Sequence, residues 1–290
     1  MPIGANPIDA AYEEVKAACA VSYLSPSTGA SIWRLAEIAS RFLATKCDLV
    51  ELVSRVPGKD YISFSRRDNS NIVARAANRL HFITDPAELA KCWRAWSAGN
   101  ISSENFRKFS YTIALAPCLA MELFDRQNKK GPATYFECLI GHMFAKELNS
   151  EPDKKATIPV HGQNIRLTMD FLFTGRHGQK VHLPVKMSTR ERVVQAWAHQ
   201  RILDGAFGSG TYKGIMVLFS ETKLDSRTRE VVEICVPDQW LAYQTLLSKI
   251  ERIYYFDLPT RYKALADRHP DVIQIRQFGH FFKERATLLG

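Results

Sequence analysis

The sequence lacks the cysteine patterns that mark a zinc site or a disulfide framework. Its cysteines are scattered along the 290 residues, with no Cys-x-x-Cys pair and no histidine at ligand spacing. In a chain of this length, such scattering predicts reduced and mostly buried thiols, as in a cytosolic protein. The six cysteines are Cys19, Cys47, Cys92, Cys118, Cys138 and Cys235.

Long apolar runs and internal repeats are also missing. The amino-terminal residues reach the acidic Asp9 without the apolar stretch of a signal peptide. The most apolar segment, residues 113–124, is too short for a membrane span and contains Pro117. These absences predict a soluble, cytoplasmic protein without a transmembrane segment.

What the sequence does contain is enough apolar material for a core and an excess of positive charge. Hydrophobic residues make up 46% and charged residues 24% of the chain, which excludes disorder as the main state. The 39 lysines and arginines outnumber the 30 aspartates and glutamates and give a net charge of +9. This surplus favours a polyanionic partner, either nucleic acid or an anionic membrane surface. Charge alone does not choose between them.

Hydrophobic periodicity divides the chain into a helical first part and an α/β second part. Residues 32–43 follow a helical period, and Asp85-Pro86 predicts the start of another helix, with a turn-rich stretch at 57–71 between them. From residue 134 onward, helices and strands succeed one another in an order that predicts an α/β fold with a mixed central sheet. The predicted helices are 134–148, 189–203 and 238–253, and the predicted strands are 157–161, 165–173, 180–186, 215–220 and 231–236.

Two charged residues on neighbouring predicted strands form a candidate catalytic site. With a period of two, Asp170 and Lys186 project from the same face, because the short connection between strands 165–173 and 180–186 predicts a hairpin. A carboxylate that holds Mg²⁺ and a lysine that handles the attacking water suit phosphodiester hydrolysis. A surface salt bridge between the two strands is the alternative.

The residues after Lys186 suggest an element that reads DNA. Ser188 and Glu191 have capping-box spacing, which predicts that a helix begins here and offers free N–H groups to a phosphate. Two arginines in its first turn would oppose the helix dipole, so a purely structural helix seldom carries them there. Arginine reads guanine and glutamate accepts from cytosine, so Arg190-Glu191-Arg192 fits G·C pairs in a major groove. For Glu191, a simple helix cap is the alternative.

The motif Lys186-x-x-x-Arg190-Glu191-Arg192, together with Asp170, resembles the site of type II restriction endonucleases with the PD-(D/E)XK fold. It is most similar to the SsoII/EcoRII-like group, which cuts CC/GG-containing sites such as CCGG or CCNGG. The resemblance implies Asp170 as a metal ligand and Lys186 as the catalytic lysine. It also implies that the Arg-Glu-Arg triplet reads the G·C pairs.

A protein of this group would be a Mg²⁺-dependent homodimer, or a tetramer of paired dimers, that cuts both strands of a short palindromic DNA duplex. It would act beside a cognate DNA methyltransferase in a restriction-modification system, and not at a membrane. The nuclease core would span residues 126–290, and the mainly helical residues 1–125 would contact DNA, the second subunit or both. On the helix before the sheet, Glu137 has the place of a further catalytic, metal-binding carboxylate; an exposed helix carboxylate is the alternative. Gln127 and Lys130 precede it as candidate DNA contacts.

Two departures from the family pattern affect the metal site. Pro184 stands where the name motif has an acidic residue two positions before the lysine. In CCGG-reading relatives the missing carboxylate comes from the following helix, and here the corresponding positions hold His199 and Gln200. Two other functions stay open. A repair or structure-specific nuclease would share Asp170 and Lys186 without needing the arginines, and a non-catalytic DNA-binding regulator would need neither.

Overall fold

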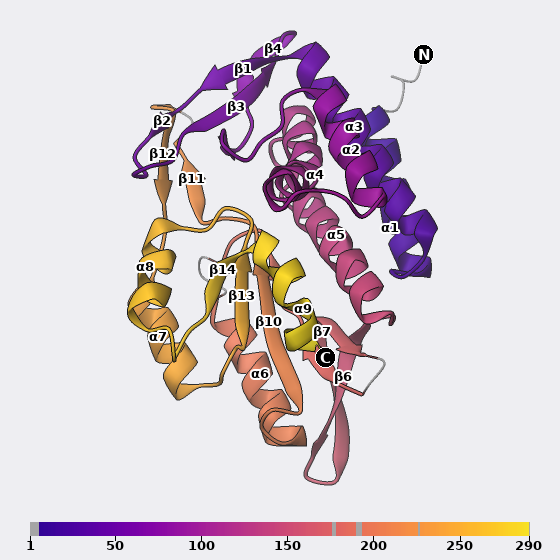
Figure 1. The fold of residues 1–290 in the computed structure, drawn as a ribbon, viewed down its shortest axis with the longest axis vertical. Helices are drawn as coiled ribbons and strands as arrows, with labels where there is room; N and C mark the ends of the chain where they lie inside the picture. The colour runs from indigo at the N-terminus through magenta and orange to yellow at the C-terminus, as the bar shows by residue number, and fades with distance from the viewer. Residues whose placement is uncertain (1–5, 176–177, 190–192, 226, 290) are drawn as a thin grey trace. The chain divides into compact units, whose positions relative to one another are not determined.

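A computed structural model of the chain describes residues 6–175, 178–189, 193–225 and 227–289 (Figure 1). The chain divides into two compact units. The first unit comprises Met1–Leu139 and Thr222–Glu233, and the second comprises Ile140–Glu221 and Ile234–Gly290. Helix α5 (Lys130–Leu148) begins in the first unit and ends in the second. It confirms the predicted helix at 134–148 and starts four residues earlier.

Four helices of the first unit begin behind a residue whose side-chain oxygen accepts a backbone N–H from the first turn, which satisfies a donor that the helix itself leaves unpaired. The helix predicted at Asp85-Pro86 is confirmed as α3, where Asp85 Oδ1 accepts from the N–H of Ala87 at 2.9 Å. The apolar segment 113–124 is the buried end of α4. No helix in the described ranges is both long and apolar enough to cross a membrane. The four helices are α1 (Pro7–Val21), α2 (Pro26–Lys46), α3 (Pro86–Ser97) and α4 (Ser103–Phe124).

The first unit also contains short strands that the sequence analysis missed. The stretch 57–71, predicted as turn-rich, includes β3 (Tyr61–Arg66) and the start of β4 (Asn69–Val73). Five of the six residues of β3 are buried, so the segment lacks the polar alternation that marks a strand with one exposed face. A separate three-stranded sheet, β11-β12-β2, takes up the start of the predicted strand 231–236, which therefore does not belong to the central sheet. The remaining strands are β1 (Cys47–Glu51), β2 (Val53–Ser54), β5 (Ala77–Asn78), β11 (Thr222–Leu224) and β12 (Glu230–Glu233).

The second unit is built on a seven-stranded sheet with the order β14-β13-β10-β8-β7-β6, in which β9 also pairs with β10. Strand β7 is antiparallel to its two neighbours β6 and β8, whereas β8, β9 and β13 run parallel to β10, and β14 runs parallel to β13. The mixed sheet predicted from the sequence is therefore confirmed. Its strands are β6 (Asp153–Val160), β7 (Gln163–Thr174), β8 (Lys180–His182), β9 (Val185–Lys186), β10 (Tyr212–Leu218), β13 (Arg252–Tyr255) and β14 (Ile275–Gln277).

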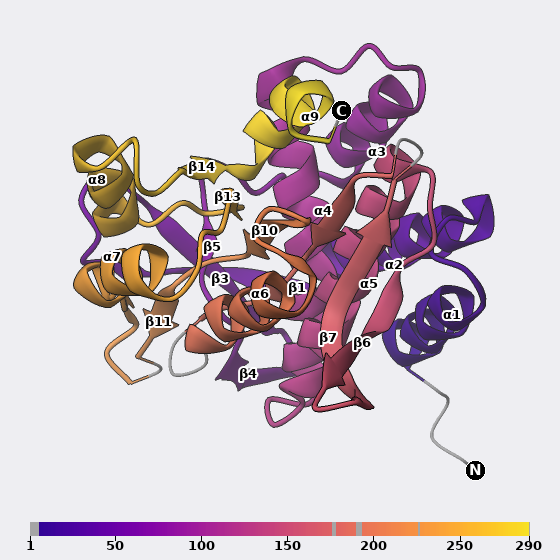
Figure 2. The ribbon, with the colours of Figure 1, turned by 90° about the horizontal axis from the view of Figure 1, so that it is seen from below.

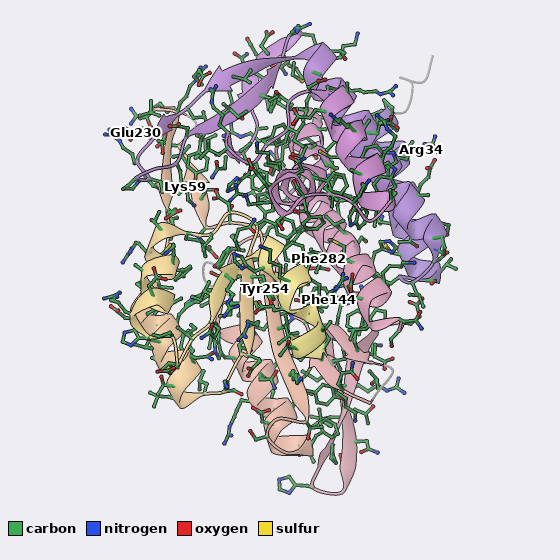
Figure 3. All side chains as sticks on the ribbon, viewed as in Figure 1. Arg34, Lys59, Phe144, Glu230, Tyr254 and Phe282 are labelled. Carbon is green, nitrogen blue, oxygen red and sulfur yellow. The ribbon has the colours of Figure 1, made fainter. Side chains whose placement is uncertain are left out.

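Helices cover both faces of this sheet, as the positions of α6, α7 and α9 show (Figure 2). On one face, α6, α7 and α8 bury residues of β10, β13 and β14 in a shared apolar core. On the other face, Phe144 of α5 stacks on Phe281 of α9 at 4.5 Å between ring centroids, and Tyr254 meets Phe281 edge-on at 5.7 Å. Phe144 and Tyr254 are labelled in Figure 3. All six cysteines of the chain are buried free thiols, as predicted. The helices are α6 (Val194–Phe207), α7 (Pro237–Leu246), α8 (Thr260–Arg268), the 3₁₀ turn η2 (Phe278–His280) and α9 (Phe281–Leu289).

Two predicted helices have different limits in the structure. For the predicted helix 189–203, the structure gives α6 from Val194 to Phe207, and Glu191 of the capping-box spacing lies outside the described residues. Helix 238–253 ends at Leu246, and its last predicted residues belong to strand β13. Ile253 lies in β13 because it packs in the core beside β10, and tertiary packing here overrides the local helical pattern.

Candidate active site

Asp170 and Lys186 are in direct contact, as their predicted positions on neighbouring strands require. Lys186 Nζ lies 2.7 Å from Asp170 Oδ1 and 2.6 Å from Oδ2. The side chain of Asp170 is 21% exposed and that of Lys186 is 28% exposed, so both are accessible from solvent. The predicted juxtaposition is confirmed. A catalytic pair and a surface salt bridge both contain this contact, so the contact alone does not choose between them.

A break in the predicted strand 180–186 gives the pair its geometry. Strand β8 ends at His182, and the chain resumes as β9 at Val185 after Pro184, which has no N–H to continue a ladder. The N–H of Val185 instead donates to Asp170 Oδ2 at 2.9 Å. Pro184 thus stands where the family motif has an acid, and the donor that orients the Asp170 carboxylate beside Lys186 is the N–H of the following residue, Val185.

His199 and Gln200, the two residues at the position of the missing acid, face different surroundings. Gln200 is buried; its amide donates to Asp204 and to the carbonyl of Tyr212, so its oxygen is left to accept from His182 Nδ1 at 3.0 Å. His199 is half-buried and interacts electrostatically with Asp170 and Lys186. Burial lowers the pKa of His199, with Asp170 opposing this shift and Lys186 adding to it. Of the two residues, only His199 is thus placed to act on the Asp170–Lys186 pair.

The buried His182 predicts a pH-dependent stability that is separate from catalysis. Burial lowers the pKa of His182 from 6.5 to about 4, so between these values the unfolded chain binds a proton that the folded chain excludes. Stability from this group is therefore fully present above pH 6.5 and is lost as pH falls toward 4. We expect the free energy of unfolding to drop by about 2 kcal/mol between pH 7 and pH 5 through this residue.

Denaturant unfolding at the two pH values measures this effect. His182→Asn should lower the stability at pH 7 but remove most of the extra loss at pH 5. The matched control is His161→Asn, because His161 is exposed; its pH dependence should equal that of the wild type. Equal slopes for the wild type and His182→Asn would contradict the assignment.

Glu221 is a functional candidate that the sequence analysis missed. It directly follows the segment predicted as strand 215–220 and is 2% exposed. Its carboxylate accepts from the N–H of Thr189 at 3.0 Å, from the hydroxyl of Thr189 at 2.7 Å and from the hydroxyl of Tyr255 at 2.8 Å. The sequence signal was a lone acid after a strongly apolar strand, but the sequence does not show which donors it would meet.

Comparison with known proteins bears on the fold. No family model matches the sequence, and no curated protein matches it. The crystal structure of the type IIP restriction endonuclease Kpn2I superposes on 96% of this chain and 97% of its own, with a TM-score of 0.79 and 24% identity. The chain has a restriction-endonuclease fold. A structure of restriction endonuclease PspGI with substrate DNA covers 98% of this chain and 93% of its own at 14% identity, but its TM-score of 0.43 is too low to support an inference.

This likeness confirms the predicted α/β, PD-(D/E)XK restriction-endonuclease-like core with its central mixed sheet and flanking helices. This fold implies a bound divalent metal ion, so the question is whether the side chains of this chain could bind one. In the described ranges, no three His, Cys, Asp or Glu side chains converge on one point. Mg²⁺ needs fewer, because it binds one or two carboxylates and takes its other ligands from water and phosphate. Asp170, partly exposed with oriented oxygens, fits such a ligand.

The other predicted site residues are not brought to this pair by any described contact. Glu137 lies half-buried on α5, in the part of that helix that belongs to the first unit. Burial raises the pKa of Tyr23, and nearby Cys138 and Glu137 add to the shift, which places Glu137 near that hydroxyl. Gln127 and Lys130 are exposed at the start of α5. The predicted base readers Arg190, Glu191 and Arg192 lie outside the described residues.

Proposed function

We propose that this protein is a type II restriction endonuclease that hydrolyses both strands of a short, palindromic, G·C-containing DNA site of the CCGG or CCNGG kind. The observation that carries the proposal is the contact of Asp170 with Lys186 where β9 resumes after Pro184. A surface salt bridge needs no such construction, whereas here a strand break and a backbone N–H orient the carboxylate. The restriction-endonuclease fold and the net charge of +9 agree with this function.

In the proposed reaction, Asp170 would hold Mg²⁺, with Glu137 as a second ligand. The ion would supply positive charge beside the phosphate and would favour deprotonation of the attacking water. Lys186 Nζ counters the phosphate charge and orients the water for in-line attack. A new phosphorus–oxygen bond forms on the side opposite the 3′ oxygen, the bond to that oxygen breaks, and the products carry a 5′-phosphate and a 3′-hydroxyl. His199, whose pKa is lowered by burial, interacts electrostatically with both members of the pair.

Sequence recognition is assigned to Arg190, Glu191 and Arg192, whose donors and acceptors match the major-groove edges of G·C pairs. A palindromic site requires two copies of the reader, so the proposal includes a two-fold homodimer in which each subunit reads one half-site. Lys130 contacts the phosphate backbone, which adds affinity but no sequence information, and Gln127 reaches a groove edge. A partner methyltransferase would protect the host DNA.

Arg190→Ala is expected to reduce the preference for the cognate site over a site with one changed base pair by about 10- to 100-fold, since a bidentate arginine contact is worth about 1–3 kcal/mol. Competitive cleavage of the two duplexes measures the preference. The matched control is Arg201→Ala, because Arg201 is exposed on α6 outside the motif. An unchanged preference in Arg190→Ala would remove Arg190 from the reader.

The function itself is tested by incubating the purified protein with plasmid DNA and Mg²⁺ and mapping the cut ends by run-off sequencing. Discrete bands with ends at one repeated palindromic sequence support the proposal. A smear without sequence preference would favour a repair or structure-specific nuclease. Binding without any cutting would favour a DNA-binding regulator.

A further inference from the structure

The backbone ladder between β9 and β10 stops just before the residues assigned to base reading. Leu218 pairs with Lys186 in register. The ladder then continues for two more hydrogen bonds, from the N–H of Phe219 to the carbonyl of Lys186 and from the N–H of Ser220 to that of Met187, both at 3.1 Å. Beyond Met187 the chain leaves the sheet.

After Met187, the acceptor for this segment is the side chain of Glu221, no longer a backbone carbonyl. The N–H of Thr189 donates to both Glu221 oxygens, at 3.0 and 3.2 Å, and the Thr189 hydroxyl donates to Oε1 at 2.7 Å. Thr189 is itself buried, and its side chain also bonds to that of Tyr262. One carboxylate therefore binds both donors of the residue that directly precedes Arg190 in the chain.

Burying a carboxylate costs free energy unless several hydrogen-bond donors satisfy it. Hydrogen bonds to such a charged group are stronger than those between neutral groups, so the donors of Glu221 are held firmly. The third donor, Tyr255, comes from β13, whose side chains pack in the core of the second unit. The carboxylate thus ties Thr189 to two strands of the sheet that also carries Lys186. A solvent-exposed cap would give no comparable restraint, because water would compete for the same groups.

We propose that Glu221 is a positioning residue, which holds Thr189 in place relative to the strand that carries Lys186 and, because Thr189 directly precedes Arg190 in the chain, couples recognition of the G·C-containing site to cleavage. This inference rests on the proposed function. Glu221 touches neither DNA nor the reacting atoms and acts through Thr189.

The chain offers a matched control in Glu284 on α9. Its side chain is 15% exposed and accepts from Arg252, Arg276 and the hydroxyl of Tyr254. Tyr254 and Tyr255 are consecutive in β13 and point to opposite faces of the sheet. Glu284→Ala therefore removes a partly buried carboxylate from the same unit and from beside the same strand, but leaves Thr189 untouched.

The experiment compares Glu221→Ala, Glu221→Gln, Thr189→Val and Glu284→Ala for cleavage of a cognate duplex and a duplex with one changed base pair. Glu221→Ala is expected to lower the ratio of the two rates by about 10- to 100-fold, the scale on which a small displacement affects a reaction. Glu221→Gln and Thr189→Val each keep part of the contact and should lie between Glu221→Ala and the wild type. Glu284→Ala should keep the wild-type ratio. If Glu221→Ala does not fold, Thr189→Val decides, because it removes a single hydroxyl.

Hydrogen–deuterium exchange of the peptide that contains Thr189 adds a readout that does not depend on activity. Exchange should become at least about tenfold faster in Glu221→Ala than in the wild type and stay unchanged in Glu284→Ala. A wild-type ratio of cleavage rates in Glu221→Ala and Thr189→Val, with a loss of melting temperature like that of Glu284→Ala, would overturn the positioning role. A wild-type protein that cleaves no DNA would overturn the proposed function instead, and the exchange data would then show whether the Glu221 anchor exists.

Discussion

Asp170→Asn is expected to lower the rate of DNA cleavage by about 10³-fold or more, because the substitution removes the only negative charge that the described contacts place next to Lys186. Asparagine keeps the size of the side chain, and its oxygen can still accept from the N–H of Val185, which now donates to Asp170 Oδ2 at 2.9 Å. The local backbone should therefore stay in place while metal binding is lost. This separation of charge from shape makes the variant informative.

Single-turnover cleavage of a cognate duplex in Mg²⁺ measures the effect, and a gel-shift assay without metal measures binding. Asp153→Asn serves as the control, because Asp153 is an exposed carboxylate on β6 of the same sheet. It should cleave at the wild-type rate. Cleavage by Asp170→Asn within about tenfold of the wild-type rate would contradict the assignment of Asp170 as a metal ligand.

Lys186→Met is expected to lower the cleavage rate by about 10²- to 10³-fold, the usual cost of losing one group that stabilises charge in the transition state. The effect should be smaller than that of Asp170→Asn, since the metal site keeps its carboxylate. Lys186→Arg should also be defective. Its planar guanidinium cannot give up a proton and does not reproduce the point charge that Lys186 Nζ places 2.6 Å from Asp170 Oδ2.

Binding and cleavage must be measured together for this variant. Lys186→Met should still bind the cognate duplex, because the proposed base readers follow it in the chain. The control is Lys180→Met, which changes a partly buried lysine on β8 of the same sheet. Discrete cleavage bands that persist at the wild-type rate in Lys186→Arg would contradict the role given to Lys186, whatever becomes of Arg190→Ala.

Local patterns predicted the parts of the site that a strand period controls. The two-residue period placed Asp170 and Lys186 on one face, and their side chains do meet. The same pattern treated residues 180–186 as one strand, but the structure divides this segment into β8 and β9, with Leu183 and Pro184 between them. A proline interrupts a strand ladder only where a neighbouring strand would have accepted a hydrogen bond from the missing N–H. The tertiary fold decides which strand lies there.

Capping chemistry could be predicted at Asp85, because the helix donor and its acceptor are two residues apart and the contact forms wherever the rest of the chain lies. The partner of the Thr189 N–H could not be predicted in this way. That N–H is bound by Glu221, 32 residues further along the chain, and only the folded sheet brings the two together.

By itself, the sequence determined the class of fold, the mixed sheet and the pair Asp170–Lys186, since apolar periodicity and hairpin connections act between residues close in the chain. Tertiary structure decided the rest. It selected His199 over Gln200 as the neighbour of the pair, because Gln200 is buried against His182, Asp204 and Tyr212. It also brought the Glu221 carboxylate within hydrogen-bonding distance of Thr189. Both outcomes depend on which buried polar group finds its donors across strands, and only the folded sheet brings those donors together.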